Sequence, residues 1–289
     1  MKISYPKIFL FIPLPILLDL YVRYVPINER FILTTITSVL SCILIFKIVS
    51  LSTKNKLYSI LSLLIFIVWG IPHLNFTSPI IFSLTFVLLV CFSLLYFGKN
   101  SKQRYLFFAG IAAFIAVVFY KYLFFLILVP PLVFFAFIQK NKILNFLTFI
   151  YGYIWGFILF ATYLLISNLF PTFVNSLLLF RGFKFYFWTS NLQTLALFSL
   201  PLILVLLSTF ILLKRRKLYM LFLPFFAAIF SFSIIPNFVN PNYLNVAISL
   251  SGISLSILMR YSANSTIRTI CIIFSVFLIL NGIITYGYN

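Results

Sequence analysis

The sequence predicts an all-α, polytopic transmembrane helical protein with about eleven spans. Of its residues, 64% are hydrophobic and only 8% are charged, whereas about a quarter of the residues in a soluble domain are charged. Apolar runs of about 16 to 25 residues follow one another with short polar breaks, and runs of this length match the thickness of a bilayer. Lysine and arginine collect in the breaks. Lipid is therefore the expected solvent for most of the chain.

The apolar runs define the predicted spans in order along the chain. The first six cover residues 8–25, 31–49, 57–72, 79–97, 105–120 and 122–138. The remaining five cover residues 143–168, 193–213, 218–235, 243–259 and 269–286. No small-residue cleavage site follows the first run, so it is interpreted as a retained signal anchor. Residues 1–289 then form a single transmembrane domain, with an extracytoplasmic interfacial segment at about 169–192.

The cations predict the orientation, because short loops rich in Lys and Arg stay in the cytoplasm. With a cytoplasmic N-terminus and alternating sides, sixteen of the 21 Lys and Arg residues fall inside and five outside. The inside residues are Lys2, Lys7, Lys47, Lys54, Lys56, Lys99, Lys102, Arg104, Lys140, Lys142, Lys214, Arg215, Arg216, Lys217, Arg260 and Arg268. The outside residues are Arg23, Arg30, Lys121, Arg181 and Lys184. The C-terminus is thus expected outside, in a multi-pass protein of the cell membrane.

The basic character of the chain does not indicate nucleic-acid binding. Its net charge of +19 is distributed between apolar runs and forms neither an arm nor a known reader motif. Cys42, Cys91 and Cys271 lie far apart inside predicted helices, without the paired spacing of a disulfide or a metal site. The sequence contains no glycine-rich phosphate loop, serine-centred elbow or zinc signature.

The two carboxylates, Asp19 and Glu29, fall at the outer end of the first span and in the loop that follows it. Placing a carboxylate at mid-bilayer costs about 2.5–3.5 kcal/mol, and placing it near the interface costs less. Asp19 is therefore expected to have a charged partner, contact with water or a functional role. One interpretation pairs Asp19 with Arg23 at i+4. The other makes Asp19 catalytic or ligand-binding, as intramembrane ionisable residues often are. Glu29, beside Arg30, is either a solvated loop acid or a second functional acid.

Several other polar residues of the predicted outer face are candidates for binding. Lys121 stands between two apolar spans, where it either reaches the outer headgroups or binds an anion. Arg181 and Lys184 lie among aromatic residues of the 169–192 segment, which predicts an interfacial helix that anchors the chain or meets lipid phosphate. His73, the single histidine, either lines its outside turn or assists a reaction there.

An ordered series of motifs crosses the middle of the chain. It consists of Ser78-Pro79, the basic turn Gly98–Arg104, Ala109-Gly110, Phe119-Tyr120-Lys121-Tyr122 and Val129-Pro130-Pro131. The series resembles the membrane glycosyltransferases of the GT-C fold, which use polyprenyl-phosphate sugars as donors. That family often shows a basic turn, a small-residue helix, a lysine at its outer end and a proline-broken helix. Asn240-Pro241-Asn242-Tyr243-Leu244 looks like the entry to a late span in those enzymes.

The resemblance implies a GT-C-like fold and transfer of a sugar from a polyprenyl-phosphate donor to an acceptor at the outer face. Asp19, with Glu29 as its rival, would take a proton from the acceptor hydroxyl, or would hold the acceptor or a divalent metal ion. Lys121, Arg181 and Lys184 would bind the lipid phosphate, and Arg23 and His73 would complete the substrate-binding set. No other cofactor is implied. The expected partners are the lipid-linked donor and membrane lipids.

Two further functions compete with this one. A non-catalytic GT-C-like subunit of a membrane glycosylation complex, bound to a partner membrane subunit, would account for the shortage of carboxylates and the short first outside loop. A lipid or polysaccharide transporter would usually show internal repeats and polar residues at mid-membrane. Neither internal repeats nor polar residues at mid-membrane are clear in the sequence.

Overall fold

The computed structural model describes residues 27–69, 79–119, 141–168, 192–217, 220–224, 226–227 and 241–287, and the regular structure in these ranges is helical. The first four helices are α2 (Ile27–Thr53), α3 (Lys56–Trp69), α4 (Pro79–Asn100) and α5 (Gln103–Phe119). The next four are α7 (Lys142–Ile166), α9 (Leu192–Lys214), α11 (Pro241–Tyr261) and α12 (Ser265–Gly287). Residues 222–224 and 226–227 add a short helical stretch.

Each of these eight helices coincides with a predicted span, which confirms the all-α class over the described ranges. Four segments are long and apolar enough to cross a membrane, namely Thr35–Thr53, Phe82–Asn100, Lys142–Ile166 and Ser265–Ile284. Four shorter helical segments are also apolar, namely Lys56–Trp69, Gln103–Val118, Ser199–Lys214 and Ile248–Tyr261. The predicted spans 8–25 and 122–138, and most of 218–235, lie outside the described residues.

The start of α2 corrects one predicted boundary. Hydropathy placed the span at 31–49 and left Glu29 and Arg30 in an outside loop, but α2 begins at Ile27 and includes both residues in its first turn. A hydropathy profile ends a span at its first charges, whereas a helix continues as long as its backbone hydrogen bonds can form. Glu29 is therefore a helical residue.

The described turns that join consecutive helices are short and use recognisable caps. Lys54 adopts a left-handed conformation (φ 55°) after α2, and Asn55 Oδ1 then accepts the Leu57 N–H at 2.9 Å, capping the start of α3. After α9, Lys217 N donates to Leu212 O at 2.9 Å and Arg216 N to Leu213 O at 3.0 Å. This is the Schellman pattern, with Arg216 in the left-handed position usually held by glycine.

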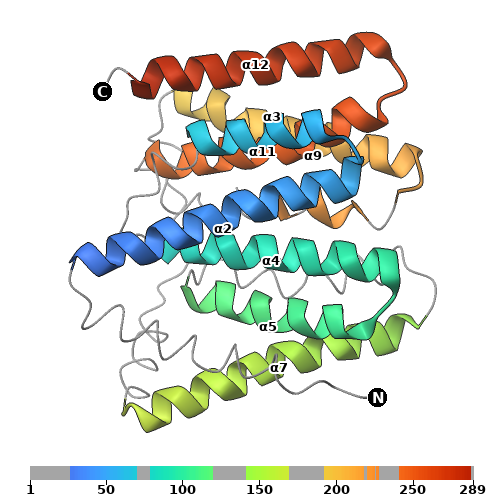
Figure 1. Ribbon diagram of the computed structural model, residues 1–289. Coiled ribbons are helices and arrows are strands. Elements are labelled where there is room, and N and C mark those ends of the chain that lie inside the picture. The colour runs from blue at the N-terminus through green and yellow to red at the C-terminus, as the bar shows by residue number, and fades with distance from the viewer. Residues whose placement is uncertain are drawn as a thin grey trace.

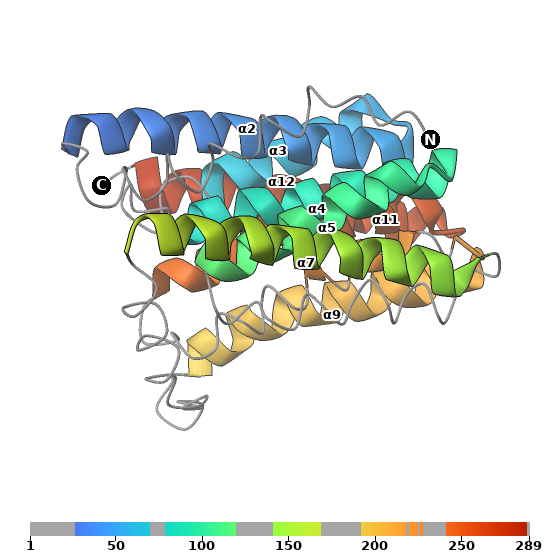
Figure 2. The same cartoon turned by 90° about the horizontal axis from the view of Figure 1, so that it is seen from below.

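The helices pack into an elongated bundle with neighbours in a nearly linear order, α7–α5–α4–α2–α3–α11–α9, and α12 packs on α3 and α11. Figure 2 shows α2 and α9 on opposite sides of the bundle, and α11 contacts both. One buried cluster joins α2, α4 and α5 with residues 220–223 and 226–227. A second joins α3, α11 and α12 through Trp69, Leu255 and Leu278. The partly buried Tyr58 packs against both clusters.

The outer helices turn apolar side chains outward. On α7, Ile166 is 79% exposed and Leu165 60%, and on α12, Ile273 is 63% exposed and Phe277 58%. Continuous exposed apolar faces of this kind are unfavourable in water but match hydrocarbon. These faces agree with the membrane character of the long helices.

Glycines bring α5 and α7 into backbone contact. A Cβ added at Gly110 would collide with the Phe149 carbonyl oxygen, and one added at Gly152 would collide with the Phe107 carbonyl oxygen. Gly156 lies four residues further along α7, where an added Cβ would stand 3.1 Å from Phe114. Small residues at this spacing allow close helix packing where lipid removes the hydrophobic driving force. The Ala-Gly pair of α5 thus has a packing role.

Serines join α3 to α11. Ser62 Oγ donates to the Gly252 carbonyl at 2.7 Å and contacts Ser256 Oγ. Ser256 Oγ in turn lies 2.8 Å from the Gly252 carbonyl and 3.3 Å from the Tyr58 carbonyl. These hydroxyls satisfy one another and the helix backbones inside the core.

Ser62→Ala and Ser256→Ala are each expected to lower stability by about 0.6 kcal/mol, the average for such contacts between membrane helices. The double variant should show a coupling energy, because both hydroxyls share the Gly252 carbonyl. The measurement is the unfolding free energy in detergent. Ser208→Ala is the matched control, since Ser208 Oγ bonds only within its own helix, to Val205 O at 2.9 Å. Coupling between Ser62 and Ser208 as large as that between Ser62 and Ser256 would contradict this account.

Candidate functional site

The described turns between helices lie at one end of the bundle, the right-hand end in Figure 1. Hydrogen bonds tie this end together across distant segments. Tyr261 Oη donates to the Ser52 carbonyl at 2.6 Å, which joins the end of α11 to the end of α2. Arg215 Nε donates to the Tyr261 carbonyl at 3.1 Å, which joins α9 to α11. We refer to this face as the basic end.

The basic end carries the described cations that the sequence assigned to the cytoplasm. They are Lys47, Lys54, Lys56, Lys99, Lys102, Arg104, Lys142, Lys214, Arg215, Arg216, Lys217, Arg260 and Arg268. Arg30, assigned to the outside, lies at the opposite end of α2. The segregation of charge derived from the sequence is therefore a real feature of the bundle over the described residues.

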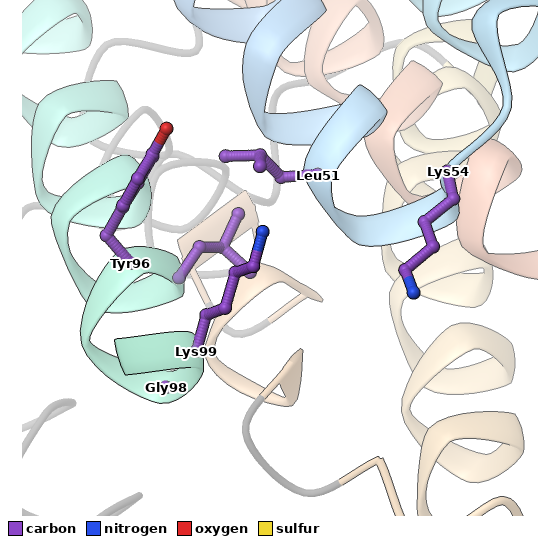
Figure 3. Close-up of a pocket in the computed structure, with 6 residues that line it drawn as sticks. Leu51, Lys54, Tyr96, Gly98 and Lys99 are labelled. Carbon is purple, nitrogen blue, oxygen red and sulfur yellow. The ribbon is translucent and has the colours of Figure 1, made fainter. Parts of the chain in front are cut away.

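A pocket opens at the basic end between the last turns of α2 and α4 (Figure 3). Its volume is about 260 Å³. The lining residues are Leu51, Lys54, Leu95, Tyr96, Gly98 and Lys99. Lys99 extends from α4 into the space between the two helix ends, with Tyr96 on one side and Leu51 and Lys54 on the other. The Lys99 amine therefore lies between the helix ends, whereas the Lys54 amine points away from Lys99 on the far side of the last turn of α2.

Aromatic contacts fix the α4 wall of the pocket. The Tyr96 ring lies 4.7 Å from the Phe92 ring and 5.5 Å from the Tyr105 ring, measured between centroids. The Arg104 guanidinium stacks over Tyr105 at 5.1 Å from the ring centroid, a cation–π contact. Tyr96 therefore contacts both the Phe92 ring and the Tyr105 ring, and Arg104 lies over Tyr105.

Of the predicted site residues of the outer face, the structure describes Glu29, which lies in the first turn of α2. Asp19, Arg23, His73, Lys121, Arg181 and Lys184 lie outside the described residues. The described ranges hold no group of three His, Cys, Asp or Glu residues suited to a metal ion.

The sequence alone does not predict this pocket. It assigns Lys54 and Lys99 to the cytoplasmic side, with Lys99 also in the basic turn Gly98–Arg104, and 45 positions separate the two lysines along the chain. The one local signal is Tyr96 with Lys99, three residues apart on one face of α4.

No family model matches the chain, and comparison with curated proteins and with solved structures finds no match.

Proposed function

We propose that this chain is a multi-pass membrane protein of about eleven spans, with the basic end in the cytoplasm. The observation that supports the orientation is the collection of cations at one end of the bundle, with Glu29 and Arg30 at the far end of α2. Retention of Lys and Arg on the cytoplasmic side is the rule that links this charge distribution to membrane insertion. The cell membrane is the proposed location.

At the opposite, outer face we propose a glycosyltransferase of the GT-C type, which moves a sugar from a polyprenyl-phosphate donor to an acceptor. The support is the resemblance of the motif series from residue 78 to residue 131, together with the pairing of α4 and α5 through a basic turn. Asp19 acts as the general base in this proposal. Lys121, Arg181 and Lys184 hold the donor phosphate.

The shortage of carboxylates favours one alternative. With two Asp and Glu residues in 289, the chain has no third acid for a fuller acidic motif, and this favours a non-catalytic subunit of a membrane glycosylation complex. Such a subunit would bind a larger partner enzyme and use its own basic and aromatic surfaces for lipid and protein contacts.

Reconstitution separates the two functions. The purified chain in liposomes, given a labelled polyprenyl-phosphate sugar and a mixture of acceptors, is expected to transfer label without another protein. Absence of transfer, combined with co-purification of a larger membrane glycosyltransferase, would replace the enzyme proposal with the subunit. The readout is the radiolabel that leaves the donor, resolved by chromatography.

A further inference from the structure

The pocket between α2 and α4 lies in a region of uncompensated positive charge. The only carboxylate side chains in the chain are Asp19 and Glu29. Glu29 stands 24 residues before Thr53 on α2, so about 36 Å of helix separates it from the pocket. Among the described residues, therefore, no acidic side chain stands near Lys54 or Lys99 to balance their charge.

Helix dipoles do not supply the missing negative charge. Four helices end at the basic end, namely α2, α4, α9 and α11. Four helices begin there, namely α3, α5, α7 and α12. Their partial charges have opposite signs and similar size, so in sum they nearly cancel. Among the described residues, no group supplies the counter-charge of this face, and we infer that it is an anion from outside the chain.

The exposed face of α2 leads into the pocket. Ile36, Leu40 and Ile43 are exposed, and Lys47 and Leu51 continue the same stripe at intervals of four residues. Lys54 follows the end of the helix in a left-handed conformation and is not part of the stripe. The stripe therefore presents apolar surface in its middle, with Lys47 and Leu51 near its end. An acyl chain on such a surface would bring its headgroup to the pocket.

We propose that the pocket binds the phosphate group of an anionic lipid from the cytoplasmic leaflet. Lys99 binds the phosphate oxygens, and the exposed Lys54 side chain turns from the position drawn in Figure 3 to join it. Leu51 and Leu95 contact the glycerol carbons, and an acyl chain follows the exposed stripe of α2. A water molecule takes about 30 Å³ in the liquid. The pocket volume of about 260 Å³ is several times larger, which is enough space for a phosphate with its ester carbons. Basic pockets between membrane helices on the cytoplasmic side suit such headgroups. The proposal rests on the membrane orientation and is independent of sugar transfer.

The test is lipid binding by the delipidated full chain in detergent, followed by native mass spectrometry. The probes are dioctanoyl phosphatidylglycerol, dioctanoyl phosphatidylcholine and inorganic phosphate. The wild-type chain is expected to retain one phosphatidylglycerol in preference to phosphatidylcholine, and to bind inorganic phosphate much more weakly. The variant Lys54→Gln/Lys99→Gln should bind phosphatidylglycerol about tenfold more weakly or worse, because two charge-assisted contacts are lost.

The matched control is Arg260→Gln/Arg268→Gln, which removes two exposed cations of the basic end that do not line the pocket. It should keep phosphatidylglycerol affinity within about twofold. Gly98→Leu keeps both lysines, adds a side chain to the pocket wall, and improves helix propensity, so its expected loss of binding reports on the cavity itself. Equal losses in the pocket and control variants would overturn the proposal, as would inorganic phosphate binding as tightly as the lipid.

Discussion

Gly110→Leu is expected to prevent stable assembly of the α5–α7 pair. The glycine faces the backbone of α7, and an added Cβ would collide with the Phe149 carbonyl oxygen and stand 2.8 Å from the Tyr153 nitrogen. Overpacking against side chains costs about 1–3 kcal/mol. Here the obstacle is backbone, which cannot change rotamer, so the expected loss is about 3 kcal/mol or more. The measurement is the unfolding transition and the yield of monodisperse protein in detergent.

Thr162→Leu provides the control for Gly110→Leu. Thr162 is an exposed residue of α7, and its hydroxyl bonds only the Ile158 carbonyl one turn earlier, at 2.8 Å. A leucine there places the same side chain toward lipid instead of toward a backbone, and should change stability by less than about 0.5 kcal/mol. If the Gly110→Leu and Thr162→Leu variants unfold at the same temperature, this would contradict the close backbone contact between α5 and α7.

Asp19→Ala is expected to lower sugar transfer by about 10²–10⁴-fold, the usual contribution of a general acid–base residue. Under the proposed mechanism the acceptor hydroxyl would then have no base at hand. Transfer is measured from labelled polyprenyl-phosphate sugar in liposomes, at matched protein yield. Undiminished transfer by Asp19→Ala would reject Asp19 as the base and favour its local pairing with Arg23.

Glu29→Gln separates the two rival acids. Glu29 lies in the first turn of α2. If Asp19 is the base, Glu29→Gln should change transfer by less than about tenfold. A loss in Glu29→Gln as large as that expected for Asp19→Ala would transfer the role to Glu29.

Hydropathy predicted the eight described helices because a segment that crosses lipid must satisfy its backbone hydrogen bonds internally, and the helix does so. The ends were less predictable. Because Glu29 and Arg30 are charged, hydropathy predicts that the span begins at residue 31, whereas α2 begins four residues earlier, at residue 27. Hydropathy reports solvent preference and not backbone geometry. The gathering of the basic turns at one end followed from alternation of spans.

Contacts between helices could not be predicted from the sequence. Gly110 and Gly152 look like ordinary small residues, and only the approach of α5 to α7 shows that both backbones need the space. Lys54 and Lys99 line one pocket because α2 and α4 pack side by side. Apolar periodicity does not encode that neighbour relation, since lipid-facing and buried positions carry the same residue types.

The central claim is a multi-pass topology with every basic turn in the cytoplasm, and cysteine accessibility tests it most directly. Single cysteines replace Ser101, Lys217 and Ala263 in the basic turns, and Asn75 in a predicted outside break, with Cys42, Cys91 and Cys271 changed to alanine. In intact cells a membrane-impermeant maleimide should label only the cysteine at position 75, and the other three should react only after permeabilisation. Labelling of any basic-turn cysteine in intact cells as fast as position 75 would contradict the topology.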